Sequence, residues 1–122
     1  EILNYATKDM LNNLKIKWSK DNCITIVLCA NGYPGNYIKH TEIKNLSEIV
    51  NDKNCEIFHA GTYEKNKKIY SNGGRVLNIT CLGEELIEAR NKSLKNLKKI
   101  NWKDGFFRKD IGWRAIKKNE NN

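Results

Sequence analysis

The hydrophobic residues of this chain gather in three short runs, and a glycine stands close to each of them. The first run, residues 24–28, holds isoleucine, valine and leucine with few polar interruptions. Such a run favours a buried strand that is covered on both faces. Residues 55–60 predict a second strand that ends at Gly61, and residues 75–82 predict a third that follows Gly73-Gly74. The predicted strands therefore lead into or out of sharp turns.

Apolar positions spaced three or four residues apart predict two main helices. Residues 2–14 are expected to form an amphipathic helix that begins without a capping residue; its apolar positions are Leu3, Ala6, Met10 and Leu14. The second helix is expected from Glu84 to Ile100, with acidic residues first and lysines later, which complements the helix dipole. Its predicted inner face consists of Leu86, Ala89, Ser93, Leu97 and Ile100.

The segments between these elements carry turn signals. Tyr33-Pro34-Gly35-Asn36 has the signature of a type II turn, with proline first and glycine where φ must be positive. Tyr63 to Tyr70 predicts a lysine-rich hairpin with Asn66 at its tip, and Leu46 to Val50 one helical turn. Asp110 to Ile116 is expected to be a closing strand, and the polar residues from Lys117 to Asn122 are expected to be disordered.

The composition bounds the size and the surroundings of the protein. With 122 residues, 39% of them hydrophobic, the chain can bury one core. No apolar stretch approaches the roughly 20 residues that a membrane helix needs, and the N-terminus lacks the order of a signal peptide. We therefore expect a soluble, intracellular protein with no membrane partner.

The four cysteines show no pattern of a metal site. Cys23, Cys29, Cys55 and Cys81 form no CxxC pair and have no zinc spacing with the two histidines. Since most of them lie in apolar runs, all four are expected to be reduced core residues.

The net charge of +8 would suit a nucleic-acid partner. However, the lysines are spread among asparagines through the whole chain and are not interleaved with aromatic residues in one stripe. The lysines thus indicate solvated faces, and we expect no nucleic-acid partner. The few arginines lie mostly in or beside glycine-containing turns, where a planar, bidentate donor matters more than bulk charge.

Three segments are candidates for chemistry. Cys55 and His59 would share one face of a strand, but no oxyanion hole or orienting acid accompanies them, so a catalytic pair has little support. Residues 71–75, Ser-Asn-Gly-Gly-Arg, combine glycine amides with a guanidinium, which is typical of an anion-binding nest but also of a plain turn. Arg108 and Asp110 form either a second basic contact or, as base rates favour, a salt bridge.

Taken in order, the turns resemble those of a known family. The motifs are GYPGNY at 32–37, FHAGT at 58–62, NGGRVL at 72–77, the Leu-Gly pair that precedes the second long helix, and FRKDIGWRA at 107–115. Together they closely resemble the C-terminal domain of the phosphoribosylamine-glycine ligases, members of the ATP-grasp superfamily. The resemblance runs from about Trp18 to Ile116. Asn31 and Asn78 depart from it mildly, since the family often has glycine or a small residue there.

The resemblance implies the fold and the activity. It implies an α+β domain, a mainly antiparallel sheet with one long flanking helix, preceded by the last helix of the ATP-grasp core. It implies residues 1–20 as the end of that core, 21–117 as the C-terminal domain and 118–122 as a polar tail. The complete enzyme would join glycine to 5-phosphoribosylamine at the expense of ATP, through glycyl phosphate, to give glycinamide ribonucleotide for purine synthesis in the cytoplasm.

The resemblance also implies which parts of the complete enzyme bind each ligand. ATP and Mg²⁺ would be bound mainly outside this chain, by the N-terminal and ATP-grasp domains, so no catalytic residue or metal ligand is expected here. Gly73, Gly74 and Arg75 are the expected substrate-binding residues, because related enzymes present a basic loop to the substrate phosphate. The alternative is a stand-alone anion- or RNA-binding module. An ATP-grasp core in the upstream reading frame would decide for the ligase.

Overall fold

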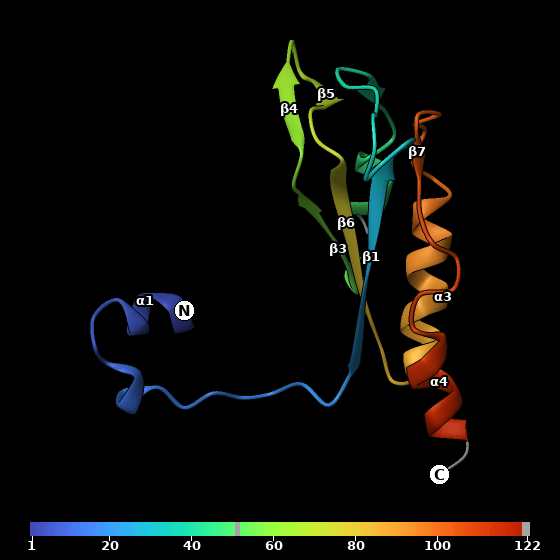
Figure 1. Ribbon diagram of the computed structural model, residues 1–122. Coiled ribbons are helices and arrows are strands. Elements are labelled where there is room, and N and C mark those ends of the chain that lie inside the picture. The colour runs from blue at the N-terminus through green and yellow to red at the C-terminus, as the bar shows by residue number, and fades with distance from the viewer. Residues whose placement is uncertain (51, 121–122) are drawn as a thin grey trace.

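A computed structural model describes residues 1–50 and 52–120 of the chain (Figure 1). It has the predicted α+β architecture, with every strand pair antiparallel. The elements in chain order are α1 (Ile2–Ala6), η1 (Leu11–Asn13), β1 (Asn22–Ala30), β2 (Glu42–Ile43), α2 (Ser47–Val50), β3 (Cys55–His59), β4 (Thr62–Lys65), β5 (Lys68–Ser71), β6 (Arg75–Gly83), α3 (Leu86–Leu97), β7 (Gly105–Phe106) and α4 (Trp113–Glu120).

The core lies between a four-stranded sheet and helix α3. The strand order is β3-β6-β1-β7, and the predicted strands at 24–28, 55–60 and 75–82 are its three longest members. Helices α3 and α4 lie on one side of this sheet (Figure 1). Along β1, Ile24, Ile26 and Leu28 are buried while the residues between them are exposed or half-buried. The prediction that this strand is covered on both faces is therefore wrong, because the helices cover one face.

A smaller sheet, in the order β2-β5-β4, extends from the first. The predicted hairpin is confirmed as β4 and β5, with Lys65 opposite Lys68. Asn66 and Lys67 form its tip with φ of 52° and 60°. Two successive positive φ values are the mark of a type I′ turn, whose twist suits antiparallel strands. The helical turn predicted near Leu46 is present as α2.

Helix α3 confirms the second predicted helix, with somewhat shorter bounds. Ala89, Ser93 and Leu97 are buried, as the spacing predicted. At its start the Glu84 amide donates a hydrogen bond to the Glu88 carboxylate at 2.9 Å. One turn later Glu88 pairs with Lys92 at 2.8 Å. The acidic residues at the start and Lys92 one turn later thus stabilise the first half of the helix.

The C-terminal part differs from the prediction. Residues 113–120 form helix α4, whereas a strand was expected at 110–116 and a disordered tail from 117. Gly112 turns the chain with φ of 82°, which breaks the alternation that resembled a strand. Arg90 of α3 then donates a hydrogen bond to the Ile111 carbonyl at 2.8 Å, which holds the start of α4 against α3. The end of the predicted tail, residues 121–122, lies outside the described residues.

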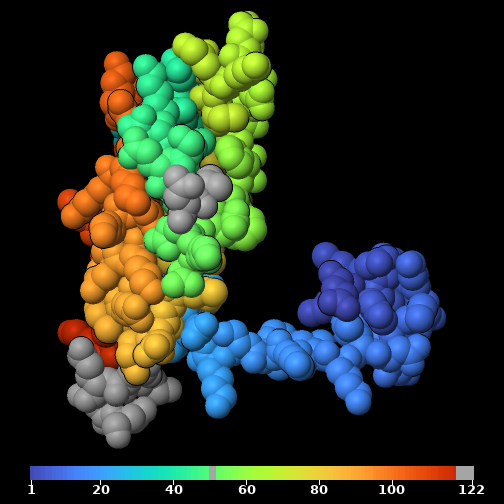
Figure 2. Space-filling view, turned by 180° about the vertical axis from the view of Figure 1, so that it is seen from behind, coloured from blue at the N-terminus to red at the C-terminus, as the bar shows by residue number. Residues whose placement is uncertain are grey.

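The N-terminal segment also forms less helix than predicted. Residues 2–14 contain only α1 and the short η1, with no side-chain cap at the start of either. The segment projects away from the rest of the molecule (Figure 2). Leu3 and Trp18 are 81% and 80% exposed. A short helix is marginal in water unless its apolar face packs on something, which explains the limited helix here. None of the helices in the described residues is long and apolar enough to cross a bilayer.

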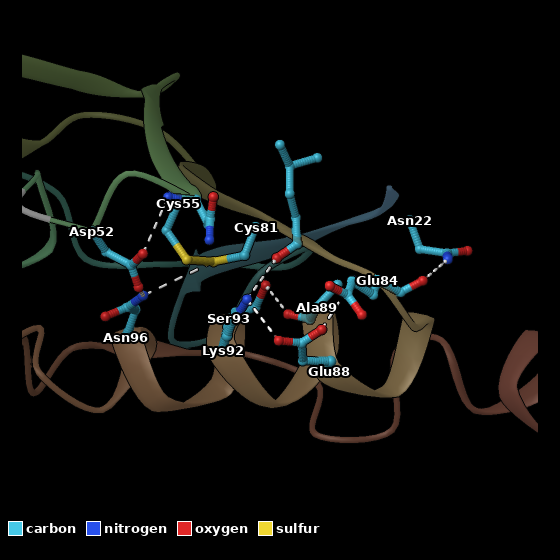
Figure 3. A network of polar contacts seen from close by, with 12 residues as sticks. Asn22, Asp52, Cys55, Cys81, Glu84, Glu88, Ala89, Lys92, Ser93 and Asn96 are labelled. Carbon is cyan, nitrogen blue, oxygen red and sulfur yellow. Dashed lines mark hydrogen bonds and ion pairs between the residues drawn. A yellow bond between two sulfur atoms is a disulfide. The ribbon is translucent and has the colours of Figure 1, made fainter. Parts of the chain in front are cut away.

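The expectation that all four cysteines are reduced is wrong for two of them. Cys55 on β3 and Cys81 on β6 are joined by a disulfide (Figure 3). The two residues stand directly opposite each other in the sheet, with their Cα atoms 4.1 Å apart. Facing positions on neighbouring antiparallel strands bring side chains this close. Cys23 and Cys29 are free thiols.

The turn after β1 is not the predicted type II turn. The Tyr33-Pro34 peptide bond is cis. Positive φ, at 95°, occurs at Gly32, and Gly35 does not have it. A type II turn with proline at its second position needs the positive φ at the residue after proline. Residues 33–36 therefore lack the backbone conformation of a type II turn.

Candidate functional site

Three glycine-containing loops meet at one end of the four-stranded sheet, the upper end in Figure 1. They are the loop that follows β1, the turn between β3 and β4, and the loop between β5 and β6. The Ala30 amide donates a hydrogen bond to the Gly74 carbonyl at 2.8 Å, and the Asn72 amide donates one to the Gly61 carbonyl at 2.7 Å. The GYPGNY, FHAGT and NGGRVL motifs therefore form one cluster.

Close packing explains why glycine is needed in these loops. A Cβ on Gly61 would lie 2.7 Å from the Cα of Gly73, so the two loops touch through their backbones. A Cβ on Gly74 would lie 2.1 Å from Cδ2 of Tyr33, whose ring covers this glycine. The role of Tyr33 was missed from the sequence, where it belonged to an expected turn. The sequence contained one sign of this role, because Tyr33 lies between two glycines, Gly32 and Gly35.

The backbone amides of the loop between β5 and β6 are only partly used. Among the residues that the structure describes, the amides of Gly73 and Gly74 donate no hydrogen bond. Gly74 is buried and Gly73 is half-buried. Buried amides normally have a partner, because an unpaired one costs free energy comparable to a lost hydrogen bond. These two amides therefore have no acceptor within the described residues.

A β-bulge turns Arg75 towards the open face of the sheet. Leu28 pairs with Leu77, but its neighbour Cys29 pairs with Arg75, so β6 has one extra residue at Val76. Without the bulge Arg75 would lie on the same face as the buried Leu77. Arg75 is instead exposed. Within the described part of the chain its guanidinium forms no ion pair, unlike Arg108, which binds Asp110.

Cys29 lies opposite this arginine, in surroundings that disfavour its thiolate. Burial raises the pKa of the Cys29 thiol, and the positive charge of Arg75 offsets only part of that effect. At neutral pH the thiol therefore keeps its proton, whereas a nucleophilic cysteine needs a lowered pKa.

The other candidates from the sequence have structural roles. Cys55 cannot act with His59 as a nucleophile while its sulfur is bonded to Cys81. The Nδ1 atom of His59 instead lies 2.9 Å from the Thr62 hydroxyl. Arg108 and Asp110 form the expected salt bridge at 2.8 Å, in which hydrogen bonding from the guanidinium lowers the pKa of the Asp110 carboxyl. In the described ranges, no group of three or more acidic, histidine or cysteine side chains could hold a metal ion.

Comparison with known proteins identifies the family. The family model described as "Phosphoribosylglycinamide synthetase, C domain" matches residues 23–114. The chain belongs to this family. The match contains all three glycine-containing loops and all of the FRKDIGWRA motif except its last residue, Ala115.

The relatives of the phosphoribosylglycinamide synthetase C domain found here are longer proteins. The chloroplastic phosphoribosylamine-glycine ligase of Arabidopsis thaliana is 41% identical over 122 residues, which are 98% of this chain and 23% of that protein. The trifunctional purine biosynthetic protein adenosine-3 of Gallus gallus is 39% identical over 117 residues, 95% of this chain and 12% of that protein. The crystal structure of the Thermotoga maritima phosphoribosylamine-glycine ligase matches with a TM-score of 0.70 and 30% identity, over 90% of this chain and 27% of that one. The chain thus spans about a quarter of the ligases that it matches.

Proposed function

We propose that this chain is the C-terminal part of a phosphoribosylamine-glycine ligase. The support is the family match together with relatives of that name that align with almost the whole chain. The complete enzyme would be an ATP-dependent ligase of purine biosynthesis in the cytoplasm. It would form glycinamide ribonucleotide from glycine and 5-phosphoribosylamine through glycyl phosphate. The alternative of a stand-alone anion- or RNA-binding module has no comparable support.

In this proposal ATP and Mg²⁺ are bound by the rest of the ligase. Magnesium prefers carboxylate oxygens, and the described residues provide no cluster of acidic side chains for it, so we assign no magnesium ligand to this chain. The N-terminal and ATP-grasp domains are its expected partners. Residues 1–20 would be the end of the ATP-grasp core, which agrees with the exposed apolar side chains of this segment, among them Leu3 and Trp18.

The role that we propose for this chain is to hold the phosphate of 5-phosphoribosylamine at Gly73, Gly74 and Arg75. The observation that carries this proposal is the pair of unused amides at Gly73 and Gly74 beside the exposed, unpaired guanidinium of Arg75, within the described residues. Successive amides form a concave site for an anion, and a guanidinium can donate to two phosphate oxygens at once. The ring of Tyr33 over Gly74 would form a wall of the site.

Kinetics of the Arg75→Ala variant of the complete ligase would test this role. Loss of a charge-assisted hydrogen bond costs about 1.5–3 kcal/mol, or roughly ten- to a hundredfold in affinity. Because the phosphate is remote from the reacting amine, the ground state and the transition state would lose the contact equally. The Michaelis constant for phosphoribosylamine should therefore rise by that factor, while kcat and the Michaelis constant for ATP stay nearly unchanged.

Arg114→Ala is the matched control, because it removes an exposed arginine of α4, at the other end of the domain (Figure 1). It should leave all three Michaelis constants unchanged. Equal losses for all three substrates in Arg75→Ala, or a variant that is merely less stable, would refute the phosphate site. Arg75 would then only tie this domain to its neighbour.

A further inference from the structure

A chain of side-chain hydrogen bonds ends directly before the Gly73-Gly74-Arg75 loop. The indole Nε1–H of Trp102 donates to Thr41 Oγ1 at 2.7 Å. Thr41 Oγ1 in turn lies 3.1 Å from Ser71 Oγ, and the Thr41 amide donates to Ser71 Oγ at 3.2 Å. Ser71 is the last residue of β5 and is completely buried, and Trp102 is 8% exposed. We call these three side chains the hydroxyl relay.

Burial decides which way the two hydroxyl groups point. Ser71 has no access to water, so its hydroxyl hydrogen needs a partner within the protein, and Thr41 Oγ1 is the acceptor beside it. Thr41 Oγ1 then accepts two hydrogen bonds, from Trp102 and from Ser71, and uses both of its lone pairs. Thr41 is half-buried and lines a surface cavity of about 550 Å³, where its own hydroxyl hydrogen can meet water. Each group of the relay is thereby satisfied.

Backbone bonds connect the relay to the loop. The Ser71 amide donates to the Thr41 carbonyl at 3.0 Å, and the His40 amide donates to the Ser71 carbonyl at 2.6 Å. The next residue, Asn72, is held to the Gly61 carbonyl. The loop that begins at Asn72 therefore starts from a residue that is fixed through both its backbone and its side chain.

The other end of the relay is attached to the loop that follows β1. The Trp102 ring packs on Gly105, where a Cβ would lie 2.2 Å from ring atom Cε3. Gly105 pairs with Ala30 at the end of β1, and the next amide, that of Asn31, donates to the Asp104 carbonyl at 2.8 Å. The hydroxyl relay thus connects two of the three loops of the candidate site and fixes their positions relative to each other.

We infer that Thr41 and Ser71 are positioning residues, which set where the Gly73-Gly74-Arg75 loop presents its amides and guanidinium to the substrate phosphate. The substrate part of this inference rests on the proposed function. Burial of the Ser71 hydroxyl has a desolvation cost that full hydrogen bonding offsets, and such networks hold one arrangement rather than several. Thr41 and Ser71 would affect phosphate binding through the loop, since neither of them would contact the phosphate.

The test uses Thr41→Val, which keeps the shape of the side chain and removes its hydroxyl. Amide hydrogen exchange in the full 122-residue chain reports whether the loop is held, through the amides of Asn72 and Gly61. Both should exchange about three- to tenfold faster, the factor that a lost neutral hydrogen bond gives. In the complete ligase the Michaelis constant for phosphoribosylamine should rise by a similar factor, with kcat unchanged. Thr41→Ser, which restores the hydroxyl, should recover both values.

Thr25→Val is the matched control, because Thr25 shares a hydroxyl hydrogen bond of 2.8 Å with Thr80 on the open face of the four-stranded sheet. It should leave both readouts unchanged. If Thr41→Val fails to fold, Ser71→Ala removes the partner hydroxyl with little change of shape and should show the same pattern.

The outcomes separate the inference from the proposed function. If Arg75→Ala raises the Michaelis constant for phosphoribosylamine but Thr41→Val behaves like Thr25→Val in both readouts, the positioning role is wrong and the phosphate site stands. If Arg75→Ala has no effect on that constant, the phosphate site is wrong and the substrate part of the inference fails with it. Faster exchange of the Asn72 amide in Thr41→Val would then still show that the hydroxyl relay holds the loop in place.

Discussion

Reduction of the Cys55-Cys81 disulfide should destabilise the domain by a measurable amount. The bond joins residues 26 positions apart, and the entropy of closing a loop of that length in the unfolded chain corresponds to about 3.5 kcal/mol at 25 °C. This is a large part of the stability of a small domain. With a urea m value of about 2 kcal/mol/M, the unfolding midpoint should fall by about 1.8 M.

The assay is urea unfolding followed by the fluorescence of the tryptophans, with and without a phosphine reductant. A Cys23→Ser/Cys29→Ser variant serves as the control, because it keeps the disulfide and lacks both free thiols. It should show the same shift on reduction as the unmodified chain. Four free thiols by mass spectrometry of the unreduced protein would refute the disulfide, and equal midpoints under oxidising and reducing conditions would refute its contribution to stability.

Two further predictions concern the glycine loops and the acid dependence of stability. Gly74→Ala should cost about 1–3 kcal/mol of unfolding free energy, because its Cβ would displace the Tyr33 ring. Gly35→Ala should be tolerated far better. Equal urea midpoints for the two variants would contradict this packing. Hydrogen bonding from Asn96 holds the pKa of the Asp52 carboxyl below its ordinary value. The ionised carboxyl therefore stabilises the fold above about pH 4, and this stabilisation is lost as the pH falls through the lowered pKa of the folded state. Asp52→Asn should therefore flatten the fall in urea midpoint between pH 5 and pH 2.5, and an unchanged slope would count against the contact.

The regular elements were predictable because local patterns decide them. The strand at residues 75–82, the hairpin tip at Asn66 and the helix after Glu84 each carry their signal within a few residues. Helix α4 was missed because Ile111, Trp113 and Ala115 alternate as in a strand, while a positive φ at Gly112 and a bond from distant Arg90 decide the outcome.

The details of the candidate site depend on contacts that sequence spacing does not contain. The disulfide follows from the register between β3 and β6, which no spacing rule gives for two cysteines 26 residues apart. The exposure of Arg75 follows from a bulge, and the role of Tyr33 follows from the position of a ring over Gly74. The motifs marked three loops as candidates, and the structure brings these loops together. They did not predict how the loops touch.

The most direct test of the proposed phosphate site is a crystal structure of the complete ligase with glycinamide ribonucleotide bound. We expect phosphate oxygens about 2.7–2.9 Å from the Arg75 guanidinium, within reach of the Gly73 and Gly74 amides. A phosphate held elsewhere, with Arg75 paired to a carboxylate of another domain, would contradict it.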